Sequence, residues 1–241
     1  MKIKVCGLKY PDNINAVAAL EPDYVGFICY DQSPRFIDDL PADALTGLKP
    51  LKTGVFVSHG IDKIIEKVSE YDLDVLQLHG QESPVICDAL KNKKPMIVTH
   101  IVDVVKNGRK VMKLSGETRK TVQLEKDVVV IKAFGLDDGF DFSQLDAYVG
   151  VVDYFLFDTK TSQHGGSGKK FNWDILEQYT LDVPFFLSGG LSLDNLAEVK
   201  KIKHPAFYGV DLNSRFETEP GLKDIGLLQK AFNLLRSTDT E

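Results

Sequence analysis

The sequence predicts a (β/α)₈ barrel, and three observations support this fold class. The chain has 241 residues, which suits one barrel of roughly 250 residues as well as two smaller domains. Short apolar runs alternate with amphipathic segments from end to end, as in α/β proteins. There are eight such runs, the number of strands that the barrel needs. A doubly wound open sheet is the competing architecture, but no GxGxxG follows the first run.

The eight predicted strands are continuously apolar and rich in β-branched and aromatic residues. Parallel strands that are buried on both faces have this pattern, whereas half-exposed strands alternate. In chain order the strands are expected at residues 3–6, 23–28, 52–57, 75–79, 128–134, 154–158, 184–189 and 206–211.

Between the strands, several segments have helical periodicity. Residues 61–71 place apolar side chains at 61, 64, 65, 68 and 71, which is one face of a helix. Residues 83–90 and 194–202 behave similarly. Asp12 and Ser192 stand where helix N-caps are expected.

Residues 93–127 interrupt this alternation. The segment is too long for the connection between a helix and a strand, which usually takes about 2–6 residues. Its Asn107-Gly108 pair between two β-rich runs predicts an inserted β-hairpin. We expect the insertion on the amino-terminal face of one barrel that spans 1–241. Active sites lie on the opposite face, so we interpret the insertion as a structural or oligomer-contact addition.

Composition excludes several classes of protein. The chain has 29 Lys and Arg against 35 Asp and Glu, a net charge of −6, which disfavours a nucleic-acid binder. No apolar run reaches the roughly 18–20 residues of a membrane span, and the amino terminus lacks the apolar core of a signal peptide. Three cysteines without CxxC spacing are typical of a reducing cytoplasm.

The loops after the last two strands suggest a phosphate site. Barrels often bind phosphate there, where glycines and helix N-termini present backbone N–H groups. Gly189 and Gly190 follow the seventh strand, and Asp211, Asn213 and Ser214 follow the eighth. A tight turn before a helix is the alternative interpretation of the two glycines.

Cys6 and Asp158 end the first and sixth strands, so both are expected at the mouth of the barrel. A partly ionised thiol and a protonated carboxyl group would form an acid–base pair. The alternatives are a buried, unreactive Cys6 and an Asp158 that caps a turn.

Other polar motifs lead to weaker interpretations. His79 ends the fourth strand and is either a site residue or a half-buried structural histidine. The glycine-rich stretch 164–173 does not match a phosphate-binding Walker A motif and is either a lid or a flexible surface loop. The histidines show no metal-ligand spacing, so no metal is predicted.

Taken together in their order, these motifs resemble the phosphoribosylanthranilate isomerase family. The resemblance rests on KVCGL (4–8), SPR (33–35), GVFV (54–57), LQLHG (76–80), FDTK (157–160) with GGSGKKFNW (165–173), LSGGL (187–191) and GVD (209–211) before Glu217. It implies a cofactor-free Amadori rearrangement of N-(5′-phosphoribosyl)anthranilate in tryptophan biosynthesis, by a monomer or homodimer that binds a small phosphosugar. It also implies that Asp158 is the general acid, Cys6 the general base, and Arg35 the ligand of the anthranilate carboxylate.

The sequence departs from the family pattern after the eighth strand. Asn213 replaces a serine, and Arg215 replaces a glycine of the phosphate loop. Two other functions stay open at this point. A different phosphosugar barrel would be expected to use strand-end carboxylates or metal ligands instead of Cys6, and a non-catalytic phosphosugar-binding module would tolerate loss of the acid or the base.

Overall fold

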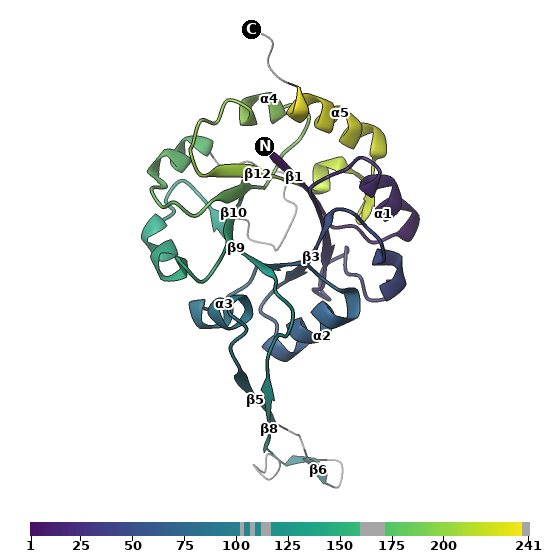
Figure 1. The fold of residues 1–241 in the computed structure, drawn as a ribbon, viewed down its shortest axis with the longest axis vertical. Helices are drawn as coiled ribbons and strands as arrows, with labels where there is room; N and C mark the ends of the chain where they lie inside the picture. Colours follow the sequence, from purple (N-terminus) through teal and green to yellow (C-terminus); the bar gives the residue numbers. More distant parts are fainter. Residues whose placement is uncertain (102–103, 107–108, 112–116, 160–171, 238–241) are drawn as a thin grey trace.

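The computed structural model describes residues 1–101, 104–106, 109–111, 117–159 and 172–237. Eight parallel strands close into a barrel in the order β1-β12-β11-β10-β9-β4-β3-β2, with the helices outside it (Figure 1). The predicted fold class is therefore confirmed. The barrel strands are β1 (Lys2–Cys6), β2 (Tyr24–Ile28), β3 (Leu51–Phe56), β4 (Val75–Leu78), β9 (Val129–Leu136), β10 (Tyr154–Thr159), β11 (Phe185–Leu187) and β12 (Phe207–Leu212).

The outer ring combines α-helices with short 3₁₀-helices. The α-helices are α1 (Pro11–Ala18), α2 (Ile61–Tyr71), α3 (Pro84–Lys91), α4 (Leu196–Val199) and α5 (Ile225–Arg236). The 3₁₀-helices are η1 (Ala42–Leu45), η2 (Phe142–Tyr148), η3 (Trp173–Gln178) and η4 (Ser214–Phe216). The apolar stripe predicted for 61–71 is confirmed, because α2 buries Ile61, Ile64, Val68 and Tyr71 against the barrel.

Two predicted helix caps were wrong. Pro11 opens α1, which moves Asp12 into the first turn and leaves Tyr10 at the N-cap. Proline suits this position because it has no N–H and its φ is already helical. The helix predicted over 194–202 is only α4, and Asn195, not Ser192, is its N-cap. Asn195 Oδ1 accepts the Ser192 N–H at 2.9 Å, so these residues form a turn ahead of the helix.

The interior of the barrel holds a small aromatic and aliphatic cluster at the amino-terminal ends of the strands. Tyr24 and Phe186 meet edge to face with centroids 5.3 Å apart, and Tyr154 and Tyr208 pack against the same cluster. These side chains fill the barrel below the polar residues at its mouth, as expected for a closed barrel with a packed interior.

A β-bulge in β12 changes which side chains face that interior. β11 pairs Phe185 with Phe207 but Phe186 with Gly209, so Tyr208 is an extra residue. Tyr208 packs against the interior cluster, and Asp211, three positions later, also reaches into the barrel, toward Lys4. Strict alternation would place these two side chains on opposite faces, and the bulge puts them on the same one.

We call residues 93–127 the arm. It contains two antiparallel pairs, β5 (Met96–Ile101) with β8 (Glu117–Val122) and β6 (Val104–Lys106) with β7 (Arg109–Val111). The predicted insertion therefore has β structure and extends away from the barrel beyond α2 and α3 (Figure 1). The turn residues 107–108 lie outside the described residues.

The base of the arm belongs to the barrel's own core. Val122 and Leu124 are 8% and 3% exposed and join the main hydrophobic cluster. Lys126 Nζ lies 2.7 Å from Asp72 Oδ1 and 3.0 Å from Asp74 Oδ1, in the connection that leads into β4. The base is therefore held at the amino-terminal ends of the strands.

Candidate active site

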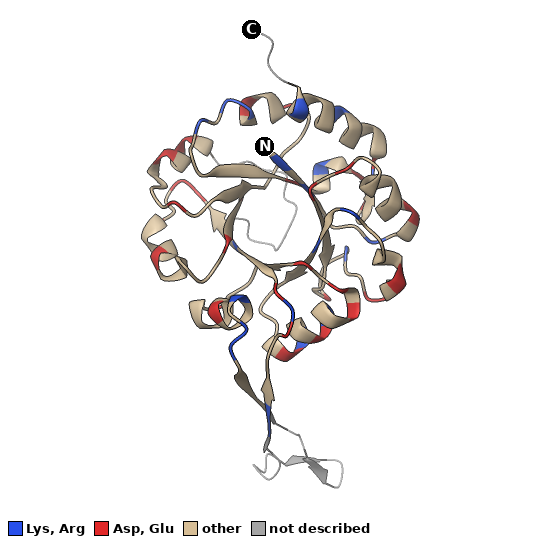
Figure 2. Ribbon diagram, in the orientation of Figure 1, with Lys and Arg blue, Asp and Glu red and all other residues tan. Residues whose placement is uncertain are grey.

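Polar side chains from several strands meet at the carboxyl ends of the barrel strands. Cys6 is the last residue of β1, Asp158 lies near the end of β10, and His79 follows β4 directly. Acidic positions recur around the outer helices (Figure 2), whereas the charged side chains at the mouth and in the interior of the barrel are mostly buried.

A buried ion pair lies inside the barrel next to Cys6. Lys4 Nζ donates to Asp211 Oδ1 at 2.9 Å, and the two side chains are 0% and 4% exposed. Lys4 shares a face of β1 with Cys6 because side chains alternate along a strand. Asp211, predicted for the phosphate loop, therefore directs its carboxylate to Lys4 within the barrel. Its prediction as a phosphate ligand has no support from this geometry.

Cys6 is buried, and its environment has opposing effects on the thiol. Burial raises the pKa of Cys6, while the ammonium groups of Lys4 and Lys223 act to lower it. A Cβ atom at Gly26 would lie 2.7 Å from the Cys6 sulfur, so this position in β2 leaves room for the thiol. The free protein thus holds Cys6 mainly as a thiol, with cations placed to favour its ionisation.

Asp158 has the properties expected of a proton donor near neutral pH. Burial raises the pKa of its carboxyl group to about 6, and the hydrogen bond from the Thr159 N–H, at 2.8 Å, opposes this. The other carboxyl oxygen lies 3.6 Å from His79 Nε2. A group with this pKa exchanges its proton readily in the physiological range.

His79 is present beside Asp158 as a neutral ring. Burial and the nearby Lys132 lower the pKa of His79 to about 4. The Gln77 amide nitrogen lies 3.1 Å from His79 Nδ1. With that amide as donor, Nδ1 accepts and the ring proton is on Nε2, the nitrogen that faces Asp158.

The two expected phosphate loops are neighbours in the barrel. Gly189 and Gly190, which follow β11 after Ser188, have φ values of +82° and +65°. A Cβ atom at Gly189 would lie 2.5 Å from the Thr159 nitrogen, so this turn requires glycine. Ser214 begins η4 after the adjacent strand β12. The geometry suits backbone recognition of an anion, and the phosphate site itself stays a prediction.

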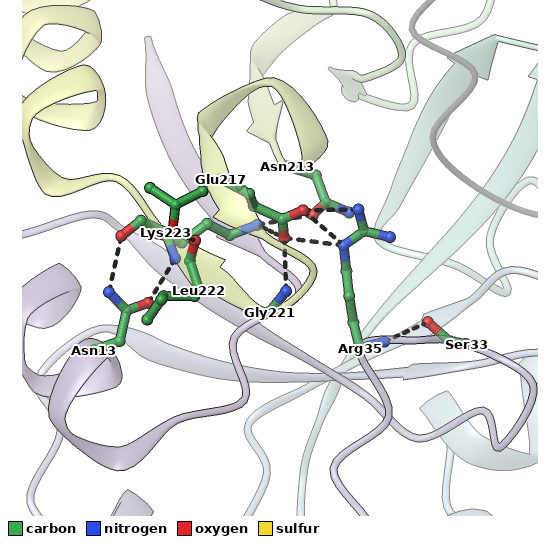
Figure 3. Close-up of polar contacts among 9 residues, drawn as sticks. Asn13, Ser33, Arg35, Asn213, Glu217, Gly221, Leu222 and Lys223 are labelled. Carbon is green, nitrogen blue, oxygen red and sulfur yellow. Dashed lines mark hydrogen bonds and ion pairs between the residues drawn. The ribbon is translucent and has the colours of Figure 1, made fainter.

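Arg35 belongs to a buried network of charged groups (Figure 3). Its Nε donates to both Glu217 carboxyl oxygens, at 2.9 and 3.0 Å, and its Nη2 donates at 2.7 Å. Lys223 Nζ donates to Glu217 at 2.6 Å and to Asn213 Oδ1 at 2.8 Å. Asn213, expected at the phosphate, thus directs its amide oxygen into this network. A Cβ atom at Gly7 would lie 2.7 Å from both Arg35 Cδ and Asn213 Oδ1, which places the network against the backbone after Cys6.

A second buried ion pair fixes the loops that follow β3 and β4. Lys132 Nζ lies 3.4 Å from Glu82 Oε2, with both side chains 2% exposed, and it donates to the Gly80 carbonyl at 2.8 Å. Glu82 accepts the Ser58 N–H at 2.6 Å. This pair therefore holds the loop that begins at His79.

Sequence reasoning missed Lys4, Lys132, Glu217 and Lys223 as members of the site. Lysines at 4 and 132 interrupt otherwise apolar strands, and this was the available signal, because an unpaired buried lysine is costly.

Other predicted features give little further information. Residues 164–171 of the glycine-rich stretch lie outside the described residues, and Asn172, next along the chain, caps η3 by accepting the Asp174 N–H at 3.1 Å. Among the described residues, no cluster of three or more His, Cys, Asp or Glu could hold a metal ion. No helix in the described ranges has the length and apolar character to cross a membrane.

The closed barrel, with ionisable groups gathered at the carboxyl ends of its strands, defines a (β/α)₈-barrel enzyme. The model of the N-(5′-phosphoribosyl)anthranilate isomerase family matches residues 3–115 and 110–234. The N-(5′-phosphoribosyl)anthranilate isomerase of Parabacteroides distasonis is 41% identical over 233 residues, which cover 95% of this chain and 90% of that protein. The chain therefore belongs to the N-(5′-phosphoribosyl)anthranilate isomerase family and is an isomerase, as the sequence predicted.

Solved structures show the same fold. Phosphoribosyl anthranilate isomerase from Thermus thermophilus superposes with a TM-score of 0.73 at 24% identity, over 98% of both chains. A phosphoribosyl anthranilate isomerase in complex with reduced 1-(o-carboxyphenylamino)-1-deoxyribulose 5-phosphate superposes with a TM-score of 0.71 at 22% identity, again over 98% of both chains.

Proposed function

We propose that Asp158 and Cys6 are the acid and the base with which this chain isomerises N-(5′-phosphoribosyl)anthranilate in tryptophan biosynthesis. The product is the aminoketose 1-(2-carboxyphenylamino)-1-deoxyribulose 5-phosphate. The observation that carries the proposal is the carboxyl group of Asp158, which stands at a strand end of the mouth with a pKa of about 6. A carboxyl group with its ordinary pKa of about 3.9 would be almost fully ionised at neutral pH.

The scheme assigns two proton transfers to the protein, and a third accompanies the final tautomerisation, in which the C2′ hydroxyl loses a proton and C1′ gains one. Asp158 gives its proton to the furanose ring oxygen, the bond from C1′ to that oxygen breaks, and an iminium ion forms. The Cys6 thiolate removes the C2′ proton, the electron pair neutralises the iminium, and the resulting enolamine tautomerises to the ketone. Afterwards Cys6 holds a proton and Asp158 has lost one, so both must exchange with solvent or with each other before the next turnover.

The surrounding residues favour the protonation states that this scheme needs. Lys4 acts to lower the pKa of Cys6. The neutral His79 turns Nε2 toward Asp158, where an N–H donor can orient the carboxyl group without adding a full charge.

The remaining site residues bind the ends of the substrate. Arg35 binds the anthranilate carboxylate, because a guanidinium group can donate two parallel hydrogen bonds to it. The backbone at Gly189, Gly190 and Ser214 binds the phosphate. Asp211 does not share in this and instead holds Lys4 beside Cys6.

The partner of this site is a small phosphosugar, and the chemistry uses neither a metal nor a cofactor. We expect no nucleic-acid or membrane partner, because the net charge of −6 opposes binding to polyanions. The enzyme works in the cytoplasm as a monomer or a homodimer, and sedimentation equilibrium distinguishes the two.

Purified protein and three variants test the proposal. Wild type should convert the aminoaldose to the aminoketose, and chromatography measures this conversion. Asp158→Asn and Cys6→Ala should each lower kcat by about 10²–10⁴-fold, the usual contribution of general acid–base catalysis. Asp146→Asn, which changes an exposed carboxylate of η2, should behave as wild type.

Complementation gives the same answer in cells. Wild type, but not Asp158→Asn, should support growth of a tryptophan auxotroph that lacks this isomerisation. Full activity of Asp158→Asn would refute the acid role.

A further inference from the structure

We propose that Glu217 and Lys223 form a positioning pair that gives Arg35 its selectivity for a substrate carboxylate. Glu217 orients the guanidinium group but cancels its positive charge. Lys223 restores a net positive charge to the three side chains. This inference rests on the proposed function, in which Arg35 binds the carboxylate of the anthranilate ring.

Glu217 holds the Arg35 guanidinium group in one orientation. The carboxylate occupies one side of the guanidinium group, through Nε and Nη2. A guanidinium group has five N–H donors in one plane, and this contact needs one from each of the two nitrogens. Among the described residues, Arg35 uses only Nε and one side of Nη2, so the N–H donors at the Nη1–Nη2 end can take a second carboxylate. Figure 3 shows Nη1 pointing away from Glu217.

Glu217 itself is held in one orientation by its other partners. One of its oxygens accepts from Lys223 Nζ at 2.6 Å and from the Gly221 N–H at 3.2 Å, in addition to Arg35. Its side chain is 4% exposed, and that of Arg35 is 12% exposed. A carboxylate with four donors in a buried setting keeps one orientation, and it imposes that orientation on Arg35.

Lys223 sets the net charge of this network. Arg35 with Glu217 alone is a neutral pair, which would attract a substrate carboxylate weakly. Lys223, with a side chain that is 0% exposed, raises the formal charge of the three groups to +1. Its position is set by the backbone, because the Lys223 N–H donates to Asn13 Oδ1 at 2.8 Å and its carbonyl accepts from Asn13 Nδ2 at 2.9 Å.

The network lies next to the base, which acts on the reacting end of the substrate. Gly7 separates Cys6 from the network, and a Cβ atom there would lie 2.7 Å from both Arg35 Cδ and Asn213 Oδ1. The Arg35 side chain thus packs directly on the backbone that follows Cys6. A carboxylate on the Nη1–Nη2 end is thereby held at a fixed distance from the base.

The experiment is a cycle of two enzymes and two ligands. Calorimetry measures the Kd of the aminoketose product and of its analogue that lacks the ring carboxylate, for wild type and for Glu217→Gln. In wild type, loss of the carboxylate should weaken binding about 10- to 150-fold, the range for a charge-assisted contact. We call the Kd of the analogue divided by the Kd of the product the carboxylate ratio. In Glu217→Gln the carboxylate ratio should fall to about threefold or less, because the product loses affinity and the analogue does not.

The cycle separates positioning from the alternatives. Glu217→Gln raises the formal charge of the network to +2, so an effect of charge alone would tighten binding of the product, and that result would overturn the proposal. Equal weakening of product and analogue would show a merely structural role and would also overturn it. Absence of product binding to wild type would do the same.

Two further variants complete the test. Lys223→Met should also reduce the carboxylate ratio, and it provides a second probe if Glu217→Gln unfolds. Glu219→Gln, an exposed residue of the same strand β13 (Glu217–Glu219), should leave the ratio unchanged. Turnover is measured separately, so wild type that binds the product but fails to isomerise the substrate would contradict the proposed function and leave the cycle to decide this inference.

Discussion

The protonation states of Asp158 and Cys6 predict an unusual pH profile. The acid must be protonated, and its pKa is about 6. The base must be a thiolate, and burial raises its pKa above the ordinary value of about 8.5. In the productive form Asp158, the stronger acid, keeps its proton while Cys6, the weaker acid, is ionised. This form amounts to at most about 1 in 300 molecules.

The sign of the pH dependence follows from the two groups. Below pH 6, Asp158 is protonated in most molecules, so kcat/KM follows the thiolate and rises about tenfold per pH unit. Between pH 6 and the thiol pKa, the gain in thiolate and the loss of protonated Asp158 cancel, so kcat/KM is flat. At pH 5 it should be about tenfold below the plateau.

The assay compares wild type with Asp158→Asn between pH 5 and 8.5, with circular dichroism as a check on folding. Asparagine does not titrate, so the small remaining kcat/KM should rise about tenfold per unit through pH 6.5–8, where wild type is flat. The substrate phosphate also titrates near pH 6, but it affects both proteins equally. A wild-type profile that rises through pH 6.5–8, or a variant that keeps the plateau, would refute the assignment.

Two other predictions concern the frame of the site. Gly189→Ala should lower kcat and stability together, because its Cβ atom would lie 2.6 Å from Asp158 Oδ1. Gly150 is the control, because it has a similar φ of +84° and a Cβ atom there would have nothing within 4 Å. Gly150→Ala should therefore keep a normal kcat, and thermal unfolding should show only the cost of a left-handed backbone, about 1–2 kcal/mol. Equal effects of the two would contradict the argument. Replacing residues 101–117 by a two-residue turn should leave kcat/KM within about twofold of wild type, because the described side chains of the arm that pack on the core lie at its base. A site defect in a folded truncated protein would show that the arm serves the chemistry.

The strands of the barrel were predictable because burial on both faces demands continuous apolar runs. All eight predicted strands are present, with ends shifted by at most two residues. The helices were less predictable, since η2 and η3 are short 3₁₀-helices whose positions depend on packing against strands distant in the sequence.

The strand-end rule also located Cys6, Asp158 and His79 at one mouth. It could not find their partners, because the pairing is set by the closure of the barrel. Lys4 and Asp211 are 207 positions apart in the chain, and Arg35 and Glu217 are 182 apart. Local sequence carries no information on such contacts beyond the presence of a lysine in an apolar strand.

The bulge at Tyr208 makes β12 intolerant of a change in length. Removal of one residue there would restore regular pairing with β11, but it would turn Asp211 outward and leave Lys4 buried without its counter-charge. The arm, in contrast, is a long insertion in the connection between α3 and β9 of the same barrel. A connection of this barrel can therefore hold extra residues, whereas the last strand must keep its irregular residue.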